Sequence, residues 1–362
     1  MTRGIVGELY RTDRDGVILD DLSRLVVSGS VEYNAERSGG TPLTGEFTLS
    51  QADALEPMRD FVSPFLSLTD EDGTVQRQRM GVYRVALPRE THTRTTAQPT
   101  YQLRDLTDLL ALGGSTEPRV VASGTNITTA LTDLAALAGL TRVAFPNSTR
   151  TTGYKRTYPA GTTWLEQSNR LCEAFGWYPE WMGLDGKLTT RPQQLLSETT
   201  PIATLTTDDP TDTISIEPTN QADLANIVVV TRDRGDQEPL EGSWRNDDPA
   251  SETSTVNIGP IVYGGGPYEA VDAETQQDID AIVNRLADQC RSYDRTVVLK
   301  IPPRFDVLGM WRTLDLEIET VAGANLRGRY WIRGWRAGFT PADAAMTLTL
   351  GRLVRFNRGE DR

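Results

Sequence analysis

The feature that most limits the fold of this chain is a two-residue alternation of apolar and polar side chains near both ends. Phe47 and Leu49 alternate with polar residues, and Leu314, Leu316 and Ile318 repeat the pattern far downstream. Successive side chains of a strand point to opposite faces of a sheet, so this period is typical of half-buried strands. We therefore expect a mainly β protein.

Turn signals divide the first β-rich region into short strands. Asp72-Gly73 separates an apolar run at 61–68 from another at 80–85, and Asp-Gly fits the positive φ angles of a tight hairpin turn. A further strand beginning at Tyr101 runs into an apolar stretch that ends at Leu112. Because single cores seldom exceed about 250 residues, the 362-residue chain should contain more than one.

The middle of the chain changes to a mixed α/β pattern. Leu131, Leu134 and Ala135 have helical spacing, with Asn126 or Thr125 as a cap and Gly139 as the stop. A second helix begins after Thr163, which has capping-box spacing to Glu166, and ends at Gly176. A small hairpin with the turn Asp185-Gly186 follows it.

The last third returns to strands and contains one further helix. The β-branched run 226–231 predicts a buried strand, and the polar passage 232–272 predicts an excursion with little core of its own. An apolar stripe then indicates an amphipathic helix over 273–290, formed by Ile279, Ile282, Val283, Leu286, Ala287 and Cys290. Cys172 and Cys290 each lie on the apolar side of a predicted helix and should be buried thiols.

Composition limits the function classes. The net charge of -13 argues against a surface that grips nucleic-acid phosphates. No apolar run reaches the roughly 18 residues of a membrane-spanning helix, and the first residues lack the pattern of a secretory signal. We expect a protein made and assembled in a cytoplasm, with no membrane-spanning segment.

Residues suited to metal or nucleophilic catalysis are few. The single histidine, His92, lies in a Thr- and Arg-rich segment that resembles a loop or an exposed strand. No Gly-x-Ser-x-Gly elbow is present. One histidine and two separated cysteines offer too few zinc ligands. We expect no catalytic residue, no cofactor-binding residue and no metal site.

A pair of carboxylates for glycoside hydrolysis is the strongest enzyme alternative. Glu180 stands between Tyr178 and Trp181, as a glycosidase acid could. We favour a hairpin whose rings pack on the preceding helix, with Glu180 facing water.

Four other motifs indicate ordinary loops. Gly264-Gly265-Gly266 lacks the Lys-Ser/Thr of a phosphate-binding loop and predicts a bend. Arg234-Gly235-Asp236 is a short tripeptide in a polar segment, and Asp70-Glu71-Asp72 and Asp208-Asp209 are acidic turns without calcium-loop spacing. We assign no function to any of them.

One basic cluster stands out near the end of the chain. On alternate strand positions, its arginines are expected to pair with acids across a subunit contact. The cluster comprises Arg327, Arg329, Arg333, Arg336, Arg352 and Arg355.

The order of these parts resembles the phage tail hub (baseplate hub) family, of which tail-tip minor tail proteins with two tube-like β-barrels are members. The resemblance covers nearly the whole chain, without an added lysozyme or peptidase domain. It rests on Gly81-Val82-Tyr83, Thr163-Trp164-Leu165, Phe175-Gly176-Trp177, Asp185-Gly186-Lys187-Leu188, Asn226-Ile227-Val228-Val229, Arg329-Tyr330-Trp331-Ile332 and Met346-Thr347-Leu348-Thr349-Leu350.

The resemblance implies an α+β, mainly β fold with two tail-tube-like β-barrel domains and a small α/β domain between them. The expected domains are 1–113, a first barrel completed by 200–233; 114–199, the α/β domain; and 234–362, a second barrel with the helical insertion 273–290.

The implied function is that of a non-enzymatic virion subunit in the tail tip. A homotrimer would imitate a six-fold ring, end the tail tube and leave a channel through which DNA is ejected without specific binding. Expected partners are a distal tail protein or tail tube above, the tape measure protein, and tail fibre or spike proteins at the tip. The alternatives are a carbohydrate- or receptor-binding module, with Trp177, Trp181, Trp331 and Trp335 as candidate rings, and a cell-wall glycosidase.

Overall fold

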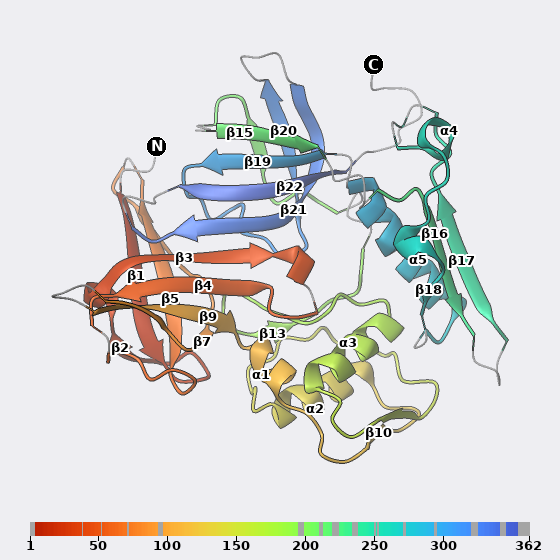
Figure 1. Cartoon of the computed structure of the whole chain (residues 1–362), viewed down its shortest axis with the longest axis horizontal. Helices are drawn as coiled ribbons and strands as arrows, with labels where there is room; N and C mark the ends of the chain where they lie inside the picture. Colours follow the sequence, from red (N-terminus) through yellow and green to blue (C-terminus); the bar gives the residue numbers. More distant parts are fainter. Residues whose placement is uncertain are drawn as a thin grey trace.

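The computed structural model divides the chain into two groups of strands and two smaller units (Figure 1). It describes residues 4–37, 39–51, 53–70, 72–92, 97–194, 199–209, 213–218, 224–233, 238–249, 251, 253–270, 273–292, 295–319, 325–340 and 345–353. The predicted α+β, mainly β class is confirmed, because strands of one continuous sheet form most of the described framework. Among these residues, no helix has both the length and the apolar composition needed to span a membrane.

The first group of strands occupies the N-terminal region, drawn from red to orange in Figure 1. The predicted turn at Asp72-Gly73 joins β5 to β6, whose paired residues include Thr69 and Val75. The group contains β1 Gly4–Thr12, β2 Ile18–Asp21, β3 Val26–Asn34, β4 Leu43–Leu49, β5 Phe61–Thr69, β6 Val75–Arg79, β7 Tyr83–Val85, β8 Arg89–His92 and β9 Ala97–Asp105, with 3-10 turns at Ser23–Leu25 and Ala35–Arg37.

The second group of strands combines segments from far apart in the sequence. It contains β14 Thr204–Thr206, β15 Thr213–Pro218, β19 Arg295–Ile301, β20 Thr313–Glu319, β21 Asn325–Gly338 and β22 Met346–Leu353. β14 pairs with β20 and β15 pairs with β19. The expectation that 200–233 completes the first barrel is therefore wrong, since its strands β14 and β15 find their partners in the second group.

The two groups are joined edge to edge into one sheet with the order β15-β19-β22-β21-β3-β4-β9-β7-β5-β1-β2. The long strand β21 pairs with β20 along its first half and with β3 along its second half. At the crossover, Gly334 lies against β3, where an added Cβ would stand 2.7 Å from the Tyr33 carbonyl oxygen. Tyr33 and Trp335, with ring centroids 6.3 Å apart, pack across this junction.

The α/β unit, at the bottom of Figure 1, has its own helical core. Asn126 accepts hydrogen bonds from the backbone N–H groups of Thr128 and Thr129, and Thr163 accepts one from Glu166, so both predicted helix starts are confirmed. The apolar stretch after β9 forms a helix rather than more strand. The elements are α1 Thr107–Leu112, β10 Arg119–Val121, α2 Ile127–Leu137, β11 Arg156–Tyr158, α3 Trp164–Ala174, β12 Trp181–Met182 and β13 Leu188–Thr189.

A separate unit, at the right of Figure 1, lies in the chain between the paired strands β15 and β19. Its strands β16 and β17 pack against α5, and Val228, Val230 and Ile279 belong to its own core. Within the passage 232–272, Ala270 is the one described apolar residue fully buried in this core, so the passage has little core of its own, as predicted. Contrary to the expected second barrel, β17 and β18 pair with β16 rather than with the second group. The elements are β16 Ile227–Arg232, β17 Leu240–Arg245, α4 Thr255–Ile258, a 3-10 turn Tyr263–Gly265, β18 Tyr268–Glu269 and α5 Gln276–Ser292.

Candidate functional site

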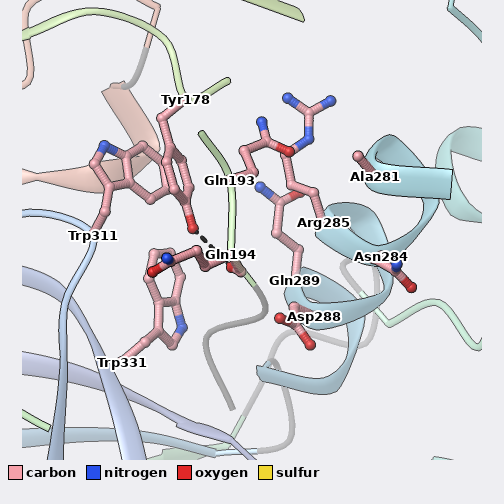
Figure 2. A pocket seen from close by; sticks show the side chains of 10 residues that line it. All are labelled: Tyr178, Gln193, Gln194, Ala281, Asn284, Arg285, Asp288, Gln289, Trp311 and Trp331. Atoms are coloured by element: carbon pink, nitrogen blue, oxygen red, sulfur yellow. Dashed lines mark hydrogen bonds between the residues drawn. The ribbon is translucent and has the colours of Figure 1, made fainter. Parts of the chain in front are cut away.

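A cavity of about 150 Å³ lies where the α/β unit, α5 and the second group of strands meet. Figure 2 shows aromatic rings on one side, the side chains of α5 on the other, and two glutamines between them. The lining residues are Tyr178, Gln193, Gln194, Ala281, Asn284, Arg285, Asp288, Gln289, Trp311 and Trp331.

Three stacked rings form the aromatic side of the cavity. Tyr178 stacks on Trp311 with ring centroids 4.7 Å apart, and Trp311 stacks on Trp331 at 6.1 Å. Trp311 has φ +55, a left-handed backbone conformation that is costly for a bulky residue. The surrounding packing therefore holds this ring in place against local backbone preference.

Hydrogen bonds and charge fix the position of the rings. The Tyr178 hydroxyl donates to the Gln194 carbonyl oxygen at 3.2 Å, while Arg191 lies 5.5 Å from the Tyr178 ring centroid and donates to the Trp311 carbonyl oxygen. Burial raises the pKa of Tyr178, and the nearby positive charge of Arg191 opposes part of that rise. The phenol therefore remains a hydrogen-bond donor at neutral pH.

The opposite side of the cavity is polar. Gln193 donates from its amide nitrogen to the Trp177 carbonyl oxygen at 2.9 Å, but its buried Oε1 has no hydrogen-bond partner. Arg285 forms an ion pair with Glu173 at 3.5 Å, and its buried Nε is likewise without a partner. Two polar atoms of the cavity lining, one acceptor and one donor, thus have no hydrogen-bond partner among the described residues.

Ion pairs hold α5 against the α/β unit beside the cavity. Arg156 contacts Glu274 at 2.8 Å, with side chains only 3% and 11% exposed, and Arg150 contacts Asp278 at 2.5 Å. Glu173, on α3, accepts a hydrogen bond from the Tyr268 hydroxyl. Burial, followed by the negative charge of Glu173 and this hydrogen bond, raises the pKa of Tyr268 to about 12. Ion pairs as well as packing thus hold α5 and the α/β unit together beside the cavity.

The structure contradicts the prediction that Glu180 faces water. This side chain is 1% exposed and neither carboxyl oxygen has a hydrogen-bond partner. Burial raises its pKa to about 8, and the neighbouring Ser168 offsets only part of that effect. Tyr178 and Trp181 do belong to the core, but the hairpin turns Glu180 inward with them. Glu180 is not among the residues that line the cavity, and a single buried acid does not make a glycosidase pair.

The four candidate tryptophans do not form one surface. Trp331 lines the cavity, whereas Trp181 lines a different groove with Arg191 and Met310. Trp177 belongs to the α/β core, and Trp335 packs at the junction of β21 with β3.

Other nominated residues lie away from the cavity. His92 ends β8, where its backbone pairs with Ala97. Cys172 and Cys290 are buried, as predicted. Gly264 and Gly265 have φ +64 and φ +76 in a turn. Arg234-Gly235-Asp236 and Glu71 lie outside the described residues.

The acidic turns and the arginine cluster use contacts within the chain. Asp72 accepts from the Thr74 N–H, and Asp209 forms an ion pair with Arg304 at 2.8 Å. Arg329 pairs with Asp315 at 2.8 Å, and Arg333 pairs with Glu36. For these two arginines the expected pairing across a subunit contact is wrong, because the same chain supplies both acids, one on the paired strand β20 and one in the 3-10 turn Ala35–Arg37. Arg355 lies outside the described residues.

Sequence reasoning missed most of the cavity. Trp311, Gln193 and Asn284 come from three separate segments, and none lies in a recognisable motif. Of the lining residues, the sequence had singled out Trp331 as a candidate ring and Tyr178 as part of the aromatic hairpin.

The joined sheet and the two smaller units together define a fold like that of phage tail and baseplate hub proteins. Solved structures show the likeness along nearly the full chain. A tail protein from Neisseria meningitidis has TM-score 0.66 at 12% identity, covering 96% of both chains. The 43 kDa tail protein of prophage MuSo2 from Shewanella oneidensis has TM-score 0.63 at 12% identity, covering 96% of this chain and 98% of that one.

A third solved structure shares the fold and has a longer chain. The structure of a Francisella PdpA-VgrG complex matches with TM-score 0.57 at 8% identity, covering all of this chain and 54% of the other. No protein-family model matches the sequence, and no curated protein does. The relationship is therefore visible in the fold, at sequence identities too low to carry a function across.

Proposed function

We propose that this chain is a non-enzymatic structural subunit of a phage-type tail tip, located in the virion tail and assembled in the bacterial host cytoplasm. The observation that carries the proposal is the full-length likeness to two tail proteins from different bacteria. It is supported by two groups of strands joined into one sheet, an arrangement that serves as scaffold rather than as a cleft.

The proposed assembly is a homotrimer in which two tube-like barrels per chain give a pseudo-six-fold ring. Among the described strands, β2 pairs only with β1 and β15 only with β19, so the sheet path ends at two strands with one neighbour each. Val17, Ile18 and Leu19 beside the β2 edge are 58%, 45% and 62% exposed. Open strand edges with apolar side chains favour association, and a closed ring of copies would cover them.

The acidic composition fits a channel for DNA. A net charge of -13 per chain repels a polyanion, so the ring would let DNA pass without specific binding. In this proposal the ring ends the tail tube below a distal tail protein or the tube itself, and it contacts the tape measure protein and tail fibre or spike proteins.

Native mass spectrometry tests the assembly. We expect a species of three times the 40.0 kDa chain mass, and electron microscopy of that species should show an open ring with six-fold appearance. The double variant Ile18→Lys, Leu19→Lys places charge on the β2 edge and should shift the population toward monomer.

Val120→Lys is the matched control. Val120 is 50% exposed, but it lies in the separate β10–β11 pair. Its assembly should equal that of the unmodified chain. Monomers alone, in the unmodified chain and with tail partners present, would refute the ring.

A further inference from the structure

The cavity between the α/β unit, α5 and the second group of strands is lined by side chains that ring formation does not require. Four carboxamide side chains line it together with the stacked rings of Tyr178, Trp311 and Trp331. Packing alone would not require these polar side chains, and leaving the buried Oε1 of Gln193 without a hydrogen-bond partner is costly. The carboxamides belong to Gln193, Gln194, Asn284 and Gln289.

Carboxamides point to a ligand that both donates and accepts hydrogen bonds. Each amide group offers two N–H donors and a carbonyl acceptor. Hydroxyl groups are the matching partners, since each carries one donor and two acceptor positions. The unsatisfied Oε1 of Gln193 and Nε of Arg285 add one acceptor and one donor that no described group satisfies.

The charges around the cavity already have partners, which favours a neutral ligand. Arg285 is paired with Glu173, and Arg191 lies over the Tyr178 ring and donates to the Trp311 carbonyl oxygen. An anionic ligand would compete with Glu173 for Arg285. A neutral ligand can use the remaining Nε donor without breaking that pair.

The size of the cavity limits the ligand to a small molecule. Its volume of about 150 Å³ holds about ten waters, because one water needs roughly 10–15 Å³ measured in this way. That is room for a single six-membered sugar ring, not for an oligosaccharide or a peptide. The aromatic side of the cavity suits the apolar C–H face of such a ring.

We propose that this cavity binds one neutral sugar unit, with the three stacked rings as an apolar wall and the four carboxamides as hydroxyl partners. The inference goes beyond the proposed tail-ring function and does not depend on it. A subunit that fails to form trimers can still bind a sugar, and a ring that forms need not bind one.

Saturation-transfer NMR on the full chain tests the proposal with methyl glycosides of glucose, galactose, mannose, N-acetylglucosamine and rhamnose as probes. We expect saturable transfer from at least one glycoside with a Kd of about 1–10 mM, since a ligand of about a dozen heavy atoms makes few contacts. Quenching of tryptophan fluorescence should follow the same curve, because Trp311 and Trp331 line the cavity.

The double variant Gln194→Ala, Asn284→Ala removes two exposed carboxamides of the cavity, and affinity should fall at least ten-fold. Gln277→Ala is the matched control, because it removes an exposed carboxamide from the same helix outside the cavity lining. Equal thermal unfolding temperatures of the unmodified chain, the double variant and the control variant will show that the fold is intact.

Three outcomes overturn the proposal. The first is no saturable transfer from any glycoside up to 50 times the expected Kd, roughly the concentration at which a single site is full. The second is binding that survives in the double variant. The third is tighter binding of N-acetyl dipeptide amides than of every glycoside, which would identify a peptide site.

Discussion

Replacing Glu180 by Gln should make the stability of this protein much less dependent on pH. Glu180 is 1% exposed, and neither of its carboxyl oxygens has a hydrogen-bond partner. Burial raises its pKa from 4.5 to about 8, with Ser168 opposing only part of the change. The folded chain therefore keeps a neutral carboxyl at neutral pH, whereas the unfolded chain ionises it.

The magnitude follows from the linkage between protonation and folding. An acid whose folded-state pKa is raised contributes full stability below the pKa of the unfolded chain, here 4.5, and loses that stability as the pH rises toward 8. Each pH unit in the middle of this window costs about 1.4 kcal/mol. The slope is smaller at both ends, where the carboxyl of the unfolded or the folded chain is only half ionised, so the total loss between pH 4.5 and pH 8 is about 4 kcal/mol. Glutamine has nearly the same size and no charge, so the variant should avoid this loss.

Urea unfolding followed by tryptophan fluorescence from pH 4.5 to pH 8.5 measures the effect. The free energies of unfolding of Glu180→Gln and of the unmodified chain should be similar at pH 4.5 and should diverge by about 4 kcal/mol near pH 8. Glu269→Gln removes an exposed carboxyl and should leave the pH profile unchanged. A difference between Glu180→Gln and the unmodified chain that stays constant across this pH range would refute the reasoning.

Two further predictions concern junctions between parts of the fold. Gly334→Ala places a Cβ 2.7 Å from the Tyr33 carbonyl oxygen and should lower the free energy of unfolding by about 1–3 kcal/mol, measured by urea unfolding; an unchanged midpoint would contradict the close packing of β21 on β3. Arg156→Met leaves Glu274 buried without its ion pair and should cost about 3–5 kcal/mol, most of which Arg156→Met, Glu274→Leu should recover; additive losses in this double-mutant cycle would show that the pair is not coupled.

Local patterns in the sequence determined most of the secondary structure. The caps Asn126 and Thr163, the Asp-Gly turns and the apolar stripe of α5 each act within a few residues, so their effects could be predicted without knowing distant partners. The burial of Cys172 and Cys290 follows from the same helical spacing. The fold class and the order of helices and strands along the chain could be predicted for the same reason.

Tertiary structure decided everything that depends on which distant segments meet. Only the pairing of β14 with β20 and of β15 with β19 assigns these two strands to the second group. Glu180 flanked by aromatic residues predicts an exposed acid, yet packing of the hairpin buries it. The cavity combines side chains of α5, of the segment after β13 and of the second group of strands, which lie together only after folding. Strand partners and cavity linings depend on contacts between residues far apart in sequence, and a local pattern carries no record of them.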